Sequence, residues 1–510
     1  MKGGFRKSMT WLHTWSGLVL GWFLVLVFLC GTASYFRPEI SQYMRPELSA
    51  AGEPETLKAL DSAQDYLQRE GMQAEHWFIT LPTEREPQRL RVFWSDEDGR
   101  HFEQLGVDSA KTVQARETRG GDFFYRLHFD LYAIPALWAR CIVGICAMFM
   151  LVAIITGVIA HRKIFKDFFT FRRGAHQKAW LDAHNVMAVF GLPFHLLMTY
   201  TGLVSLMFLY FPWGMVSEFG SDREAFFEEA QGYSDHIEAA GQSAPLARFS
   251  TMAETAMSHW QSETVGRVQV HDPGDANARV SIEVPDTRQV TYRAETLVFD
   301  GVSGELLSAN PLPSLASHTY GFFYGLHLGR FADTGLRWLL FLAGIGGTGM
   351  VATGLILWSQ KRYSRWQSGS GPTVMYRLID ALNRTVVLGL PVAMASFFIA
   401  NRLLPIELTE RQHWEERSFM LVWAAVLLLS LCYQGRQAWR HLALVATLGF
   451  ASVPAVSALT TQRGMLSSIQ QGEWLFVGMD AALLVIAIVF AALAWHLGRH
   501  KKATLRGDQP

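Results

Sequence analysis

The chain has 510 residues and no net formal charge, and 50% of its residues are hydrophobic. These hydrophobic residues gather in runs of about 16–25, the length that crosses a hydrocarbon layer as a helix, which argues against a soluble enzyme. We expect the protein to lie in a lipid bilayer and to bind no nucleic acid. Eight membrane spans are expected: Trp15–Tyr35, Cys141–Ala160, Val186–Tyr210, Leu339–Trp358, Thr385–Ala400, Ser418–Tyr433, Leu442–Leu459 and Trp474–Leu497.

Basic residues flank alternate ends of these runs, so the positive-inside rule places both termini in the cytoplasm. The basic N-terminus could also begin a signal peptide. The first run is too long for one and lacks a small-residue cleavage site, so we expect an uncleaved helix. The basic groups are Arg6 with Lys7, residues 161–178, residues 360–362, Arg436 with Arg440, and residues 499–502.

Two long polar segments, 37–127 and 213–326, interrupt the runs and are expected outside the cytoplasm. Each reads as a small α+β unit. Helical spacing covers 56–71 and 244–261, and strand-like alternation covers 78–81, 90–94, 268–270, 278–284 and 290–294, with a hairpin at 298–307. The spans then lie in 1–36, in 128–165, in 166–212 together with a cytoplasmic loop, and in 327–365, and four more lie in 381–497.

The four cysteines fall inside the runs, where packing as small buried hydrophobes is the default expectation. No disulfide is expected in the polar segments, and no CxxC pair offers an iron–sulfur or zinc site. The cysteines are Cys30, Cys141, Cys146 and Cys432.

The chain is duplicated over residues 1–365. His13 and Gly31 of the first run recur with the same spacing as His184 and Gly202 of the third. His128 recurs as His327, and the pair Thr156-Gly157 recurs as Thr353-Gly354 with a slip of two residues. The repeated unit is therefore a helix, a polar domain and a second helix, with a histidine at each helix start.

Repeated histidines at helix mouths favour haem ligation, since imidazole is a common axial ligand and an iron held from two sides needs two. By topology His13 and His184 lie near the cytoplasmic face, and His128 and His327 near the outer face. We expect these four to hold about two b-type haems, with no CxxCH motif for covalent attachment. His195 lies about 16 Å beyond His184 along the same helix. It either makes a hydrogen bond or ligates the outer haem or a further one.

Other polar and small residues in the runs have two readings each. Gly17, Gly21 and the glycines of 344–349 either make room for a macrocycle or pack helices closely, and the glycine string is no dinucleotide loop because no βαβ unit surrounds it. Arg140 and Arg337 either hold haem propionates or anchor helices at the interface. Asp480 either serves a proton or quinone site or pairs with a neighbouring helix.

These features resemble the PepSY-associated transmembrane family, which includes inner-membrane ferric-siderophore reductases. The resemblance rests on LHTWSGL at 12–18, GEL at 304–306, YGLHLGR at 324–330 and GLILW at 354–358. It implies four core helices, two PepSY-like periplasmic domains and b-type haem, and it does not extend to the last four helices. One departure is His161, which stands where the second repeat has Trp358.

The function expected from this resemblance is electron transfer across the membrane to a periplasmic ferric siderophore. The electrons would come from a cytoplasmic or quinol donor, because no nicotinamide or flavin domain is visible. Two other functions stay open: a non-enzymatic PepSY regulator that binds partners, and a permease for iron or siderophore.

Overall fold

A computed structural model describes residues 2–49, 52, 55–87, 89–96, 99–107, 109–161, 177–220, 222, 225–226, 238–292, 294–309, 315–367 and 373–504. The chain forms two compact units, which we call the helical unit and the sheet unit. The helical unit is Met1–Pro46, Arg116–Leu203 and Trp338–Pro510, and the sheet unit is Glu47–Ala115 and Val204–Arg337.

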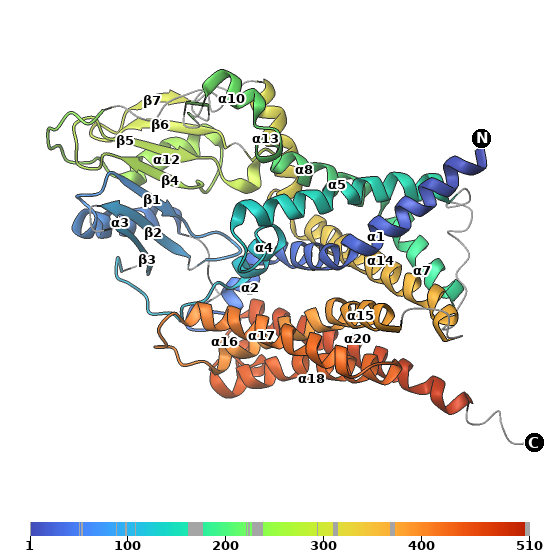
Figure 1. Cartoon of the computed structure of the whole chain (residues 1–510). Coiled ribbons are helices and arrows are strands. Elements are labelled where there is room, and N and C mark those ends of the chain that lie inside the picture. Colours follow the sequence, from blue (N-terminus) through green and yellow to red (C-terminus); the bar gives the residue numbers. More distant parts are fainter. Residues whose placement is uncertain are drawn as a thin grey trace, which may run out of the picture. The chain divides into compact units, whose positions relative to one another are not determined.

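The helical unit is a bundle of long apolar helices, with the start of α1 and the end of α20 at the same end (Figure 1). Apolar side chains such as Ile145, Phe149 and Ile155 of α5 point outward, as contact with lipid requires. The helices are α1 (Lys2–Ser34), α2 (Arg37–Tyr43), α4 (Gly121–Phe129), α5 (Ala136–Ala160), α7 (Gln177–Phe190), α8 (Leu192–Ser205), α14 (Thr334–Gln367), α15 (Thr373–Arg384), α16 (Leu390–Leu403), α17 (Arg411–Cys432), α18 (Arg436–Thr460), α19 (Met465–Gln470) and α20 (Trp474–Thr504).

Six of the helices in the described ranges are long and apolar enough to cross a membrane, and the count rises to seven if α7 and α8 form one span. This supports a multi-pass membrane protein but differs from the eight spans expected. The sixth run forms α17, whose first turns carry Arg411, Glu415, Glu416 and Arg417, so its apolar part is short.

The third run is broken rather than straight. α7 and α8 meet at a bend of 66° beside Gly191. Pro193 stands at the start of α8, where its missing N–H and its ring disturb the helical ladder. The fifth run is longer than expected, because α15, a π-helical turn at Thr385–Gly389 and α16 follow one another as a single span from Val374 to Leu403.

The sheet unit contains one antiparallel sheet of seven strands in the order β3-β2-β1-β4-β5-β6-β7. Its elements are α3 (Thr56–Glu70), β1 (His76–Thr80), β2 (Leu90–Asp96), β3 (Gly99–Leu105), α9 (Met207–Tyr210), α10 (Trp213–Phe219), α12 (Phe249–Trp260), β4 (Val268–His271), β5 (Arg279–Glu283), a 3-10 turn (Asp286–Arg288), β6 (Thr296–Asp300), β7 (Leu306–Ala309) and α13 (Leu315–Leu328).

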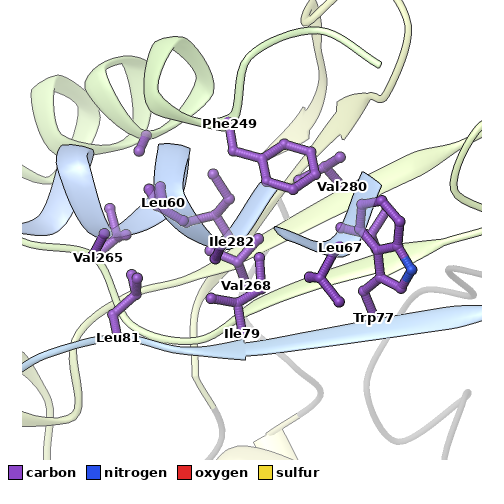
Figure 2. Packing of buried hydrophobic residues seen from close by; sticks show 14 of the residues in the cluster. Leu60, Leu67, Trp77, Ile79, Leu81, Phe249, Val265, Val268, Val280 and Ile282 are labelled. Carbon is purple, nitrogen blue, oxygen red and sulfur yellow. The ribbon is translucent and has the colours of Figure 1, made fainter. Parts of the chain in front are cut away.

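The two polar segments do not form separate units. β1 of the first pairs with β4 of the second, with His76 opposite His271 and Ile79 opposite Val268. α3 and α12 bury their apolar faces on the same side of the sheet, so that residues such as Leu60, Trp77 and Phe249 share one core (Figure 2). A strand edge left bare in one segment is thereby covered by the other.

Most of the expected strands and both helices form in the sheet unit. The hairpin of β6 and β7 also forms, with Gly304 at φ +75°, a conformation that glycine adopts without strain. The strand expected at 290–294 was wrong. Its described residues make bends, and Tyr292 instead stacks on Tyr324 of α13 with ring centroids 4.3 Å apart. The aromatic residue that suggested a strand here, Tyr292, is therefore placed by contact with a helix and not by strand pairing.

Candidate functional site

His13 of α1 and His184 of α7 lie together in the helical unit. Their ring centroids are 6.3 Å apart and the ring planes are inclined at 70°. The Nδ1 of His13 is 2.9 Å from the carbonyl oxygen of Ala153, and the Nδ1 of His184 is 2.8 Å from that of Met350. A carbonyl can only accept, so each Nδ1 carries the proton and each Nε2 keeps its lone pair.

The two hydrogen bonds occupy equivalent positions in the repeat. Ala153 lies three residues before Thr156, and Met350 lies three residues before Thr353, which are the two repeated threonines. Each carbonyl stands four residues before a glycine, Gly157 or Gly354. A Cβ on Gly157 would lie 3.1 Å from His13 Cε1, and one on Gly354 would lie 3.2 Å from His184 Cε1. The missing side chains therefore leave the helix surface open to the imidazoles.

His128 and His195 follow the same rule at another level of the helical unit. The Nδ1 of His128 donates to the carbonyl of Val27 at 2.6 Å, four residues before Gly31. His195 hydrogen-bonds the carbonyl of Ala343, four residues before Gly347. A Cβ on Gly31 would lie 2.7 Å from the His128 ring, and one on Gly347 would lie 3.1 Å from His195 Nε2.

These four histidines form two levels along α1. His128 reaches α1 at Val27, and the His195 ring meets Phe28 with centroids 6.0 Å apart. Both contacts lie about 21 Å along α1 from His13, at 1.5 Å per residue. His195 is 1% exposed, and its Nε2 is buried with no hydrogen-bond partner among the described residues. His195 lies on α8 and His184 on α7, so the bend of 66° between these helices means that the two residues do not lie along one straight helix as expected. The hydrogen bond to Ala343 is one of the interpretations that the sequence left open.

The last of the four histidines expected to ligate haem, His327, lies in α13 of the sheet unit. By the repeat, Met198 and Gly202 occupy the positions that Val27 and Gly31 occupy for His128. Arg140 ion-pairs with Asp130 at 2.7 Å and lies over the Phe129 ring.

His161, which replaces an aromatic residue of the repeat, lies 3.2 Å from the Asn185 side-chain amide. The glycines of the fourth span mainly pack helices: a Cβ on Gly344 would clash with Thr32 of α1, and one on Gly349 with Met187 of α7. Gly17 and Gly346 have open space instead. The packing interpretation therefore holds for Gly344 and Gly349.

The geometry of the His13–His184 pair fits a metal ion between the two rings. With a metal–nitrogen bond of about 2.0 Å and a ring radius of roughly 1.2 Å, two imidazoles on opposite sides of one ion would have centroids about 6.4 Å apart. The centroid distance of 6.3 Å in this structure is close to that value. The Nδ1–H to carbonyl bond is also the second contact that ligating histidines usually make, because it fixes the tautomer and the ring orientation.

A second buried polar group, which sequence reasoning largely missed, lies at one end of the C-terminal helices. Asp480 accepts a hydrogen bond from Tyr43 of α2 at 2.7 Å, so it pairs with a neighbouring helix, which is one of the two interpretations that the sequence left open. Arg402 donates to the carbonyl of Tyr43 at 2.7 Å. Arg411 and Glu415 are both fully buried and form an ion pair. Their sequence signal was weak, since α17 reads as a helix with an ordinary charged start.

The fold and the paired histidines define a polytopic helical membrane protein with polar groups placed between its helices. The family model of the PepSY-associated TM region matches residues 10–361, more than half of the chain. The protein therefore belongs to the PepSY-associated TM family. It is also similar to the uncharacterized protein PA4219 of Pseudomonas aeruginosa, with 24% identity over 397 residues that cover 74% of this chain and 95% of the relative.

Proposed function

We propose that the protein is a b-type haem oxidoreductase of a bacterial inner membrane, with both termini in the cytoplasm, which passes electrons outward. The observation that carries the proposal is the His13–His184 pair. Two repeat-equivalent histidines lie 6.3 Å apart, and carbonyls in equivalent positions hold both Nδ1 atoms. Two imidazoles whose Nδ1 atoms both bond to carbonyls could each offer Nε2 to one haem iron, which would then supply electron transfer.

His13 and His184 would hold the first haem, and His128 would be one ligand of the second. His327, its counterpart in the repeat, and His195, whose buried Nε2 has no described partner, are the two candidates for the other ligand. When bound, haem supplies one-electron transfer. Residues of this chain fix the ring tautomers, keep water away and set the two levels apart along α1.

The acceptor in this proposal is ferric iron held by a siderophore on the outer side. One electron reduces Fe(III) to Fe(II), and a cytoplasmic reductant or a quinol is oxidised to supply it. Oxygen donors hold the smaller, more highly charged ferric ion more tightly, so reduction releases the iron. The resemblance to inner-membrane ferric-siderophore reductases supports this acceptor, and the two histidine levels along α1 are consistent with two haems in series.

The first test is haem content and spectrum. The purified protein should give about two b-type haems per chain in a pyridine haemochrome assay. His13→Ala and His184→Ala should each remove the same haem, because both rings contact one iron. His441→Ala is the matched control, since His441 is exposed and stacks on Tyr433. Haem-free wild-type protein, or different spectra for the two variants, would overturn the assignment.

A second test separates His195 from His327. In proteoliposomes with a ferric chelate outside and a reductant inside, His128→Ala should stop chelate reduction while the first haem still becomes reduced. The true partner of His128 should reproduce that phenotype when it is replaced by alanine, and the other residue should not. Unchanged chelate reduction in the His128→Ala protein would refute this route.

A further inference from the structure

A different pair of histidines lies in the sheet unit, where the two polar segments join. His76 of β1 and His271 of β4 stand directly opposite each other in the antiparallel register. Their ring centroids are 4.7 Å apart and the planes are inclined at 75°. Both side chains are half-buried. Each belongs to a different segment of the chain, so the pair bridges the seam of the sheet.

The spacing of this pair suits two ligands on neighbouring positions of one metal ion. For a nitrogen–metal–nitrogen angle of about 90–110°, a bond of about 2.0 Å and a ring radius of roughly 1.2 Å, the centroids lie about 4.5–5.2 Å apart. The observed 4.7 Å falls inside that range. Ligands on opposite sides of an ion would need the longer distance seen between His13 and His184.

The surroundings of the pair tolerate a cation. The Nδ1 of His76 is buried and makes no hydrogen bond within the described part of the chain. A bound metal ion or a water molecule would satisfy this nitrogen. Arg279 stands opposite His271 on the neighbouring strand β5. Its guanidinium forms an ion pair with the Asp300 carboxylate at 3.0 Å, which offsets its positive charge. Glu75 and Asp272 flank the pair just beyond the ends of β1 and β4, and the Asp272 N–H donates to the Glu75 carbonyl at 2.8 Å.

We propose that His76 and His271 form a binding site for a divalent first-row transition metal. No third histidine, cysteine or carboxylate joins them in the described residues, so water or an oxygen donor of a chelate would fill the remaining positions. Imidazole ligation with open positions predicts the order Cu²⁺ above Ni²⁺ above Co²⁺. Because the ion would bridge β1 and β4, binding should stabilise the seam between the two segments. This site is independent of the haem proposal.

The test uses the full chain in detergent, purified without a histidine tag and stripped of metal. Cu²⁺ added to one equivalent should give an electron paramagnetic resonance spectrum with two equatorial nitrogens. His76→Gln and His271→Gln should each weaken Ni²⁺ binding at least tenfold, and the double variant no further. His101→Gln is the control, because His101 lies in the same sheet but is held by Asp96 at 2.9 Å and by stacking on Trp94. Unchanged Ni²⁺ affinity in the double variant would overturn the proposal.

Hydrogen exchange gives a readout that does not depend on the variants. Ni²⁺ should slow amide exchange in both β1 and β4 of the wild-type protein, and it should not do so in β6 and β7 at the far edge. If the substitutions themselves disturb the sheet, this wild-type measurement decides. No slowing in β1 and β4, together with a copper spectrum of fewer than two nitrogens, would refute the site.

Discussion

At the residue scale, the membrane histidines share one arrangement, an imidazole donating to a helical carbonyl that stands four residues before a glycine. It recurs at His13, His184, His128 and His195. The duplication in the sequence located three of these histidines, His13, His184 and His128, because repeated positions stand out against differing neighbours. It also located three of the glycines, Gly31, Gly157 and Gly354. The carbonyl partners could not be predicted, since which backbone oxygen faces a ring depends on how two helices are rotated against each other.

This arrangement predicts that a methyl group at Gly31 will displace His128. In Gly31→Ala the new Cβ would lie 2.7 Å from the ring atoms Cε1 and Nδ1, so the imidazole or α4 must move. Overpacking of this kind costs about 1–3 kcal/mol. The melting temperature in detergent should fall and the spectrum of one haem should shift. Gly346→Ala, which meets no atom within 4 Å, should change neither property. Equal effects of the two variants would contradict the close approach.

A second residue-scale prediction concerns Asp300 in the turn after β6. Backbone N–H bonds from Ser303 and Val302, the Ser303 hydroxyl and the Arg279 charge hold the pKa of Asp300 below its usual value of 3.8. A lowered pKa means that the carboxylate stabilises the fold at neutral pH, and that this stabilisation disappears as the pH falls through the folded-state pKa.

Asp300→Asn should therefore lower the thermal stability of the sheet unit at pH 7, and the difference from wild type should shrink towards pH 3. Fluorescence-monitored melting at both values provides the measurement. Asp286→Asn is the control, because Asp286 is exposed and makes a single ion pair with Arg330. A difference that grows on acidification would show that the sign is wrong.

At the element scale, the C-terminal helices hold the two stretches of chain that flank the first polar segment. Asn401 donates to the carbonyl of Met44 at 3.1 Å, and Arg411 donates to that of Glu117 at 3.0 Å. Thr118 donates to Glu415 within the same buried group. Hydropathy could predict four more apolar helices, but it could not predict that a charged helix start would be buried against residues about 300 positions earlier in the chain.

Removal of one partner from this buried group should be costly. Arg411→Met leaves the Glu415 carboxylate buried without its cation and frees several backbone carbonyls. The expected loss is about 3–5 kcal/mol, seen as a lower melting temperature in detergent. Arg417→Met is the matched control on the same helix, since its partner Glu410 is 3.9 Å away and both side chains are largely exposed. That change should cost about 0–1 kcal/mol, and similar losses for both variants would argue against the buried network.

At the scale of the whole molecule, two polar segments that residues 128–212 separate in the chain build one sheet with one core. Trp77 of β1 is fully buried, packs against Phe249 of α12 and donates to the carbonyl of Gly71 at 2.7 Å. The seam between β1 and β4 lies inside the sheet, because these are the third and fourth of its seven strands in spatial order. Neither half can bury its apolar face away from water without the other, so we expect the sheet unit to unfold as one cooperative unit.

Trp77→Ala should destabilise both halves by about 3–5 kcal/mol. Hydrogen exchange should accelerate in β5 and β6 of the second segment as well as in β2 of the first. Phe102→Ala, at an edge-strand position that is 59% exposed, should leave both halves protected. Faster exchange confined to the first segment would show that the halves are independent.

The sequence by itself determined that this is a multi-pass membrane protein of the PepSY-associated TM family, with an internal duplication and histidines repeated at equivalent positions. Those properties depend on hydrophobic length, charge placement and local spacing, which a chain carries along its own length. Only the tertiary structure decided that the two polar segments share a sheet, that the third run bends at Gly191, and that the carbonyls of Ala153 and Met350 hold His13 and His184. Each of these depends on contacts between residues far apart in the chain, where strand register and helix rotation choose among partners that local pattern leaves equivalent.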